Sequence, residues 1–177
     1  TMPTPPYIKK MLGNVSDYQT IYAKYGFSAA APTAGLHFTP ELLKQIKKHH
    51  KWSELTLNVG LGTFLPVKEN DIQDHHMHEE SYTISPSTIQ DLRSNDLPTL
   101  AIGTTTLRAL ESNPSLIPGH HTTSIFIYPP YEFKVVDALL TNFHLPGSTL
   151  LMLVSAFCSA PQTATPFTTF KHSLLGR

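Results

Sequence analysis

Apolar residues recur at helical spacing after a clear start signal near residue 40. Residues 39–41 (Thr-Pro-Glu) supply an N-cap hydroxyl, a proline for the first helical position and a first-turn carboxylate. Leu42, Leu43 and Ile46 follow on one helix face, which predicts a helix there. Similar patterns predict further helices over residues 17–25, 85–92, 107–111 and 148–157.

Strand patterns lie between these helices. Leu55, Leu57 and Val59 alternate with polar residues, which is the period of a half-buried strand. Residues 97–102 are nearly all apolar and lead into Gly103. Two later strands are predicted over residues 124–128 and 137–143. Because strands alternate with helices and several strands are apolar on both faces, we expect an α/β fold. Its sheet should be mixed, largely parallel and flanked by helices.

The composition is that of a folded, water-soluble chain. The 177 residues suffice for one domain, and 40% hydrophobic against 15% charged residues excludes general disorder. No apolar run is long enough to span a membrane and no signal peptide is visible, so we expect a cytoplasmic protein with no membrane contact. The single Cys158, in an apolar stretch, agrees with a reducing compartment. We expect one partial domain over residues 1–158 and a loosely ordered tail over residues 159–177.

Positive charge is unevenly distributed along a chain that is neutral as a whole. Thirteen Lys and Arg balance thirteen Asp and Glu, yet the first 51 residues hold seven lysines against only Asp17 and Glu41. Four of these lysines, with two histidines, lie in residues 44–51 at the polar end of a predicted helix. A solvated helix surface is the simpler interpretation, and phosphate binding is the alternative.

Glycines mark two places where a ligand could approach the backbone. Gly103 begins a Gly-Thr-Thr-Thr run where a buried strand gives way to a helix. Free backbone N–H groups, the positive end of the helix dipole and three hydroxyls would meet there, which suits a carboxylate or a phosphate. Gly60 and Gly62 follow another strand. At both places, an ordinary turn with a capping residue explains the same pattern without a ligand.

Histidines and neighbouring polar residues supply candidate proton carriers. The cluster at residues 74–80 (Asp-His-His-Met-His-Glu-Glu) lacks a helical histidine pair with a carboxylate, and adjacent residues of an extended segment point to opposite faces. A single acid, base or hydrogen-bond donor is therefore favoured over a metal site. Asn142, His144 and Ser148 lie between a strand end and a helix start, where ligand crevices of open α/β sheets occur. Loop hydrogen bonds and a serine cap are the alternative.

Six sequence blocks occur in an order typical of one family. They are AAAPTAGLHF at residues 29–38, VGLGTF at 59–64, MHEE at 77–80, AIGTTTLRALES at 101–112, FIYP at 126–129 and VDALLTNFHLPGSTLLMLVSAF at 136–157. Together they resemble the S-adenosylmethionine:tRNA ribosyltransferase-isomerases of queuosine synthesis. Three positions depart from the family pattern, which usually has His at Asn58, a polar or basic residue at Leu65 and Gly at Pro130.

The resemblance implies transfer and isomerisation of the ribosyl moiety of S-adenosylmethionine. Its acceptor is 7-aminomethyl-7-deazaguanine at a queuosine-type wobble position of tRNA, and the products are epoxyqueuosine-tRNA, adenine and methionine. S-adenosylmethionine is then a consumed cosubstrate, and no permanently bound cofactor and no metal are expected. The oligomeric state is not predicted.

The resemblance also implies two groups of site residues. The candidate catalytic residues are His37, His78, Glu80 and His144. The candidate substrate-binding residues are Thr33, Gly60, Gly62, Thr63, Thr104, Thr105, Thr106, Arg108, Asn142 and Ser148. Arg108 would bind a phosphate or carboxylate, with a helix-surface ion pair as the alternative interpretation. For His37, the alternative is a hydrogen bond that tethers a loop.

Family members are longer than this chain, which matches the carboxyl-terminal part of their large α/β domain. No block resembles their small β-barrel domain. We therefore expect the chain to be incomplete for activity. The two alternatives are a non-catalytic chain that binds nucleoside or tRNA and a metal-dependent hydrolase that uses residues 75–80.

Overall fold

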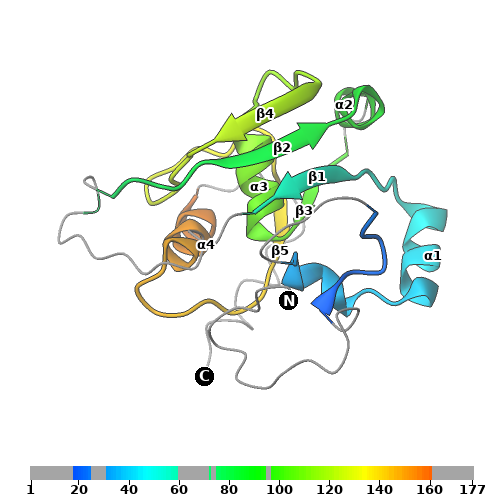
Figure 1. Ribbon diagram of the computed structural model, residues 1–177, viewed down its shortest axis with the longest axis horizontal. Coiled ribbons are helices and arrows are strands. Elements are labelled where there is room, and N and C mark those ends of the chain that lie inside the picture. The colour runs from blue at the N-terminus through cyan, green and yellow to red at the C-terminus, as the bar shows by residue number, and fades with distance from the viewer. Residues whose placement is uncertain (1–17, 25–30, 60–71, 73–74, 95–96, 161–177) are drawn as a thin grey trace.

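The computed structural model describes residues 18–24, 31–59, 72, 75–94 and 97–160 (Figure 1). In chain order, the described elements are a 3₁₀-helix η2 (Thr33–His37), α1 (Pro40–His49), β1 (Leu55–Asn58), β2 (Glu80–Ile84), α2 (Pro86–Arg93), β3 (Leu100–Ile102), α3 (Thr104–Glu111), β4 (Gly119–Thr123), β5 (Ala138–Leu140) and α4 (Thr149–Ser159). No helix in the described ranges is long and apolar enough to cross a membrane.

The predicted helix starts are confirmed by their caps. The Thr39 side chain accepts a hydrogen bond from the Leu42 N–H at 3.2 Å at the start of α1. Ser85 caps α2 and Ser148 caps α4 through the same spacing, to Thr88 and Leu151. Three basic residues in the last turn of α1 lie at the negative end of the helix dipole, which stabilises that end.

The helix predicted over residues 17–25 is wrong within the described part of that range. Tyr18 is in 3₁₀ conformation and residues 19–24 form a bend and a turn, in which the Ala23 N–H donates to the Thr20 carbonyl oxygen at 3.1 Å. The segment holds β-branched and tyrosine residues that lose side-chain freedom in a helix. The side chains of Tyr18 and Thr20 are nevertheless buried.

Two sheets replace the single, largely parallel sheet that we expected. β1, β2 and β4 form an antiparallel sheet in the order β1-β2-β4, with Leu57 opposite Tyr82 and Tyr82 opposite His121. β3 and β5 form a separate parallel pair, with Ala101 opposite Leu139. The α/β class with flanking helices is confirmed. The strand direction differs because β2 and β4, rich in Thr, Ser and His, carry the alternating burial of an antiparallel sheet.

The strand predicted over residues 124–128 is also wrong. The ladder ends at Thr123, and the Ile125 N–H donates to the Thr123 hydroxyl at 3.1 Å. A local side-chain bond therefore takes the place of strand pairing at this point. β5 is shorter than its predicted range of 137–143 and begins after Asp137, whose carboxylate accepts the Thr99 N–H at 2.8 Å.

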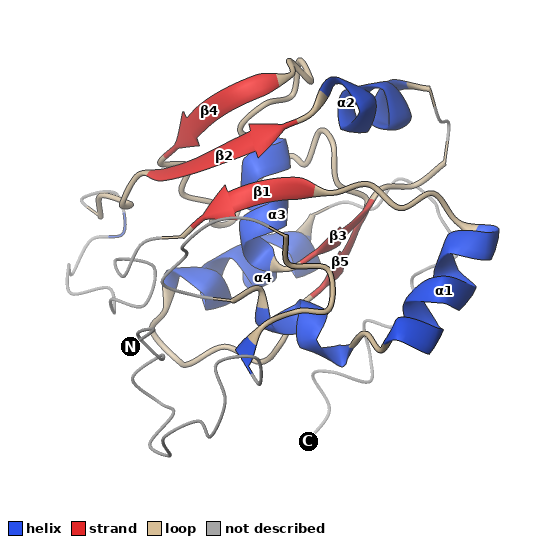
Figure 2. Cartoon of the chain, turned by 45° about the vertical axis from the view of Figure 1, so that its right-hand side comes forward, coloured by secondary structure: helices blue, strands red, loops and turns tan. Residues whose placement is uncertain are grey.

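The core lies between the antiparallel sheet and helices α3 and α4. Figure 2 shows α3 beneath the three-stranded sheet and beside the β3–β5 pair, with α1 at the periphery. The core is formed mainly by Tyr82, Ile84, Ile89, Leu107, Leu110, Ile127 and Leu153. Because α3 contacts β1, β3 and β5, it joins the two sheets. The tail is predicted to be loosely ordered over residues 159–177. Ser159 is instead the last residue of α4, and residues 161–177 lie outside the described residues.

Candidate active site

The candidate site is built at the carboxyl ends of the two parallel strands. β3 ends at Ile102 and β5 at Leu140, and the Gly103 N–H donates to the Leu140 carbonyl oxygen at 2.8 Å. This bond brings the start of α3 beside the start of loop 141–148. Parallel strands place ligand crevices at this edge, because the chain turns away from the sheet there.

The start of α3 has the features expected of an anion-binding turn. Gly103 has a φ of +93°, a conformation that glycine adopts without strain, and it provides no side-chain cap for the helix. A Cβ atom built at Gly103 would meet no atom within 4 Å, so the space beside the turn is open. Thr104 is buried, while Thr105 and Thr106 are half-buried beside the same turn. The backbone N–H groups of this turn favour a carboxylate or phosphate.

His37 comes from a distant part of the chain and contacts this loop. Its Nε2 lies 3.1 Å from Oδ1 of Asn142, across 105 positions of sequence. An amide oxygen only accepts, so Nε2 donates and the neutral ring keeps Nδ1 as an acceptor. His37 is the last residue of η2 and its side chain is exposed, so Nδ1 can take a proton from a bound molecule.

His144 lies on the same loop in a different environment. Its ring is half-buried, and Nε2 lies 3.0 Å from the Thr141 hydroxyl. Burial lowers the pKa of His144 below its ordinary value, because the low-dielectric surroundings disfavour the charged ring. The imidazole is therefore neutral near pH 7 and able to accept a proton.

Glu80 and Arg108 are paired with each other in the interior. Arg108 Nη1 donates to Glu80 Oε2 at 2.6 Å, and the two side chains are only 2% and 4% exposed. Arg108 Nε also donates to the Ile125 carbonyl oxygen at 3.2 Å. Burial lowers the pKa of Arg108, and the Glu80 carboxylate opposes that effect. The surface ion pair considered as an alternative for Arg108 is thus a buried one that ties α3 to β2.

Within the described ranges, no hydrogen bond or ion pair connects the other candidate site residues to the carboxyl ends of β3 and β5. His78 is exposed just before β2 and forms no ion pair or hydrogen bond with a described residue. The Ser148 hydroxyl caps α4 and also donates to the Leu145 carbonyl oxygen at 2.7 Å. This agrees with the alternative interpretation of Ser148 as a serine cap. Thr33 begins η2 and is half-buried. Gly60, Gly62 and Thr63 lie outside the described residues.

The histidine-rich segment does not form a metal-ligand cluster among the residues whose placement is given. No group of three His, Cys, Asp or Glu side chains there could hold an ion. Glu80, at its end, is engaged with Arg108, and the His75 ring packs edge-on against Phe126 with centroids 5.2 Å apart. The described part of the segment therefore offers nothing that favours the metal-dependent hydrolase.

Sequence reasoning missed Glu111, which shapes the approach to β5. Its carboxylate accepts hydrogen bonds from the N–H groups of Lys134, Val135 and Val136, each at 2.9 Å. The Tyr131 hydroxyl lies 3.4 Å from the same carboxylate. The available signal was a charged residue on the apolar side of a short helix, next to Leu107 and Leu110. Thr141, the partner of His144, was missed as well.

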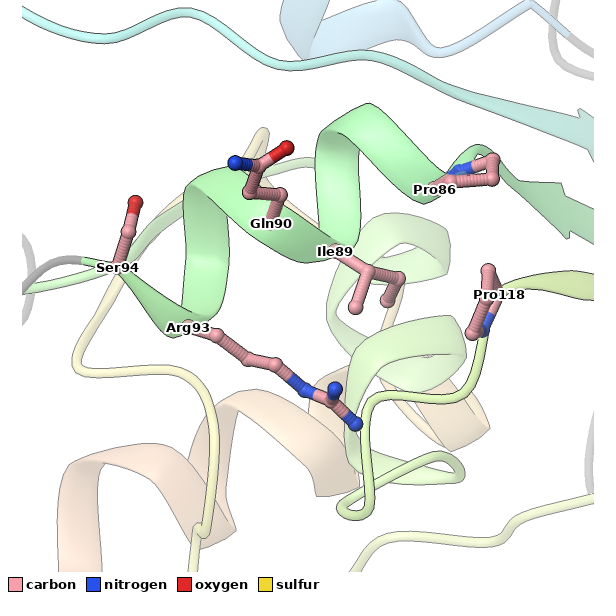
Figure 3. Close-up of a pocket in the computed structure, with 6 residues that line it drawn as sticks. All are labelled: Pro86, Ile89, Gln90, Arg93, Ser94 and Pro118. Atoms are coloured by element: carbon pink, nitrogen blue, oxygen red, sulfur yellow. The ribbon is translucent and has the colours of Figure 1, made fainter.

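A shallow pocket on α2 contains none of the predicted site residues. It is lined by Pro86, Ile89, Gln90, Arg93, Ser94 and Pro118 (Figure 3). Arg93 extends across it, and Nη2 donates to the Ser115 carbonyl oxygen at 3.0 Å. That guanidinium is engaged in holding the loop before β4, and the pocket supplies no acid or base.

Comparison with known proteins identifies similar sequences and similar solved structures. Residues 1–170 match a family described as queuosine biosynthesis protein. The chain is 54% identical over 165 residues to the S-adenosylmethionine:tRNA ribosyltransferase-isomerase of Finegoldia magna, and 55% identical over 164 residues to that of Natranaerobius thermophilus. Each alignment covers 88% of this chain and 48% of the relative, so the chain spans about half the length of the curated relatives it matches.

The structural match agrees with the sequence matches. A crystal structure of S-adenosylmethionine tRNA ribosyltransferase from Thermotoga maritima superposes with a TM-score of 0.54 at 44% identity. The superposition covers 70% of this chain and 40% of the Thermotoga maritima chain. The α/β arrangement described above is therefore shared with a solved protein of similar sequence.

Proposed function

This chain belongs to the queuosine biosynthesis protein family, and on that premise we propose that it contributes the acid–base and substrate-binding half of a tRNA ribosyltransferase-isomerase. The ribosyl moiety of S-adenosylmethionine is moved to the aminomethyl group of 7-aminomethyl-7-deazaguanine in tRNA and isomerised. Adenine and methionine leave. S-adenosylmethionine is a consumed substrate in this scheme, and tRNA, which is modified in the cytoplasm, is the macromolecular partner.

The reaction requires proton transfers at defined places. A base removes a ribose proton that the neighbouring sulfonium makes acidic, a donor assists the departure of adenine, and the attacking amine must be neutral. Each step needs an imidazole or a comparable group that exchanges a proton near neutral pH. Two imidazoles adjoin the carboxyl edge of β3 and β5.

The contact between His37 and Asn142 carries the proposal. It joins two sequence blocks at one edge of the fold, at 3.1 Å, and it fixes the ring so that Nδ1 is the acceptor. We assign His37 as a proton acceptor and Asn142 as the residue that orients it. His144, held neutral by burial, is the second proton carrier.

The start of α3 is the proposed binding place for the anionic part of a substrate. The methionine carboxylate of S-adenosylmethionine matches the N–H groups and the positive dipole end at Gly103. Thr105 and Thr106, both half-buried, supply hydroxyls beside it. The buried Glu80–Arg108 pair fixes α3 relative to β2 and so acts by positioning this turn.

Because we expect the 177-residue chain to be incomplete for activity, the test is single-turnover adenine release by a longer form that includes the rest of the family sequence. This form is used in excess over S-adenosylmethionine and tRNA that carries the aminomethyl deazaguanine. Adenine that forms only when both substrates are present supports the proposal. His37→Gln is expected to lower the rate by about 100-fold or more, the usual contribution of a general base. His120→Gln is the matched control, because His120 is an exposed histidine on β4.

A second candidate function follows from the length comparison. The chain covers 48% of its curated relatives, so it can retain substrate contacts without the full set of catalytic groups. Binding of S-adenosylmethionine or tRNA by the chain, with no adenine release even by the longer form, would favour this non-catalytic binding role. Stoichiometric zinc with hydrolytic activity would instead favour the metal-dependent alternative.

A further inference from the structure

Helix α1 carries a basic surface that the core does not use. None of its ten residues is buried, and it lies at the periphery of the fold (Figures 1 and 2). Lys44, Lys47 and Lys48 lie within the helix, and Lys51 follows it closely. Glu41 is the helix's only acidic residue. We refer to Lys44, Lys47, Lys48 and Lys51 as the α1 lysines.

Aromatic contacts hold this helix in a fixed position. Phe38, just before α1, and Trp52, just after it, pack edge to face with ring centroids 5.5 Å apart. Tyr22 packs edge-on against both rings, at 6.5 Å and 5.4 Å. The two ends of the helical segment are thereby tied together, so the lysine side chains project from a preorganised base.

The charges on this surface are only partly neutralised. Lys47 Nζ lies 5.7 Å above the Trp52 ring, a cation–π contact that leaves its charge in place. Lys51 Nζ lies 3.8 Å from an Asp91 oxygen. Lys44 and Lys48 are exposed and form no hydrogen bond or ion pair with a residue in the described ranges. Four residues apart, they lie on the same side of the helix.

The basic helix is connected to the candidate site through its N-terminal end. His37 ends η2 three residues before α1 begins, and its ring contacts Asn142. A long polyanion bound along α1 would therefore pass beside the edge where the reaction is placed. We propose that the α1 lysines bind the phosphodiester backbone of the tRNA substrate, with Lys44 and Lys48 making direct phosphate contacts. This inference rests on the proposed function for the choice of RNA.

RNA fits this surface better than an anionic membrane does. Helices that lie in a lipid interface present a broad apolar face beside the basic one. On α1, Leu42 is the exposed large apolar residue, whereas Leu43 and Ile46 are half-buried. Backbone phosphate recognition needs positive charge on a fixed element and no apolar insertion.

The test measures binding of a fluorescent anticodon stem–loop RNA to the 177-residue chain at several salt concentrations. The double variant Lys44→Ala/Lys48→Ala is expected to bind about 10-fold more weakly at low salt. It should also reduce the slope of log affinity against log salt by roughly 1.4 to 1.8, the loss of two phosphate contacts. Lys134→Ala removes an exposed lysine from the segment before β5, outside α1, and should change neither quantity. Circular dichroism of the variants checks that the fold is retained.

Three outcomes would overturn the inference. They are no RNA binding by the unmodified chain, equal losses in the Lys134 control and the double variant, and a double variant that loses binding to phosphatidylserine vesicles but not to RNA. Failure of the proposed function has a different result, in which RNA binding depends on Lys44 and Lys48 while the longer form never releases adenine.

Discussion

His37 and Asn142 share a hydrogen bond of 3.1 Å across 105 positions of sequence. The bond connects η2, ahead of the basic helix α1, with the loop that follows the parallel pair. A histidine whose Nε2 is committed to an amide oxygen has one ring nitrogen left for chemistry. Any substitution that displaces either segment therefore changes the direction in which this nitrogen points.

Breaking the buried pair between Glu80 and Arg108 should be strongly destabilising. Arg108→Met leaves the Glu80 carboxylate buried without its partner, and we expect a loss of about 3 to 5 kcal/mol in the free energy of unfolding. Adding Glu80→Leu should restore a large part of that loss, because no uncompensated charge remains. Denaturant titration of the four proteins in this cycle measures the coupling. Strictly additive losses would contradict the pairing.

Replacing Glu111 should loosen the segment that leads into β5. Glu111→Gln puts an amide nitrogen against one of the three backbone N–H donors, and we expect a loss of about 1 to 3 kcal/mol in the free energy of unfolding. Tyr131→Phe removes only the 3.4 Å contact and should cost much less. Chemical denaturation compares them.

Glu111→Gln should also change the alkaline titration of Tyr131. Burial, with the nearby Glu111 charge, raises the pKa of Tyr131 to about 12. Its stabilising contribution is complete below the unfolded pKa of about 10 and is lost as the pH rises from there towards 12. In Glu111→Gln the midpoint should move down towards 10, as measured by ultraviolet absorbance with Tyr131→Phe as the reference. An unchanged midpoint would show that the Glu111 charge does not reach the phenol.

Gly35 is required by close packing in η2. A Cβ atom there would overlap the Tyr22 hydroxyl and approach the Thr20 methyl to 2.8 Å. Gly35→Ala should therefore lower the free energy of unfolding by about 1 to 3 kcal/mol, the usual cost of overpacking. Tyr22→Phe in the same background removes the hydroxyl and should recover part of the loss. Thermal melting of the single and double variants distinguishes this from a general effect of alanine.

His144 should titrate below the ordinary histidine value of 6.5. Burial disfavours its charged form, so the folded chain binds fewer protons than the unfolded chain when the pH falls below that value. The stabilisation is complete above pH 6.5 and is lost as the pH falls through the lower folded pKa. Proton NMR of the ring, assigned with His144→Gln, measures the midpoint. A midpoint at or above 6.5 would contradict the burial of the ring.

Helices α1 and α2 could be predicted because their signals are local. A hydroxyl, a proline and an apolar stripe fixed the starts of α1 and α2 within a few residues, and the structure shows the predicted caps. Strands β2 and β4 could not be predicted in the same way, whereas the alternating residues of β1 indicated a strand. β4 reads Gly-His-His-Thr-Thr, and its strand conformation comes from pairing with β2 rather than from its own pattern.

In the candidate site, too, several residues could be predicted locally, whereas their contacts could not. Asn142 and His37 were each identified within their own blocks, but their contact depends on how η2 lies against the loop after β5. Arg108 was expected at a ligand or at the surface, and it is buried because Glu80 of β2 faces it. Glu111 was missed because its partners are backbone N–H groups, which leave no trace in the sequence.

Helix α3 couples the local unfolding of the two sheets. At its start, the Gly103 N–H donates to the Leu140 carbonyl oxygen of β5. In its middle, Arg108 is paired with Glu80 of β2, and at its end Glu111 accepts hydrogen bonds from the segment before β5. Amide protons of β2 and β5 belong to sheets that are not paired with each other. Because both depend on one eight-residue helix, these amides should exchange with deuterium in a single cooperative opening rather than sheet by sheet.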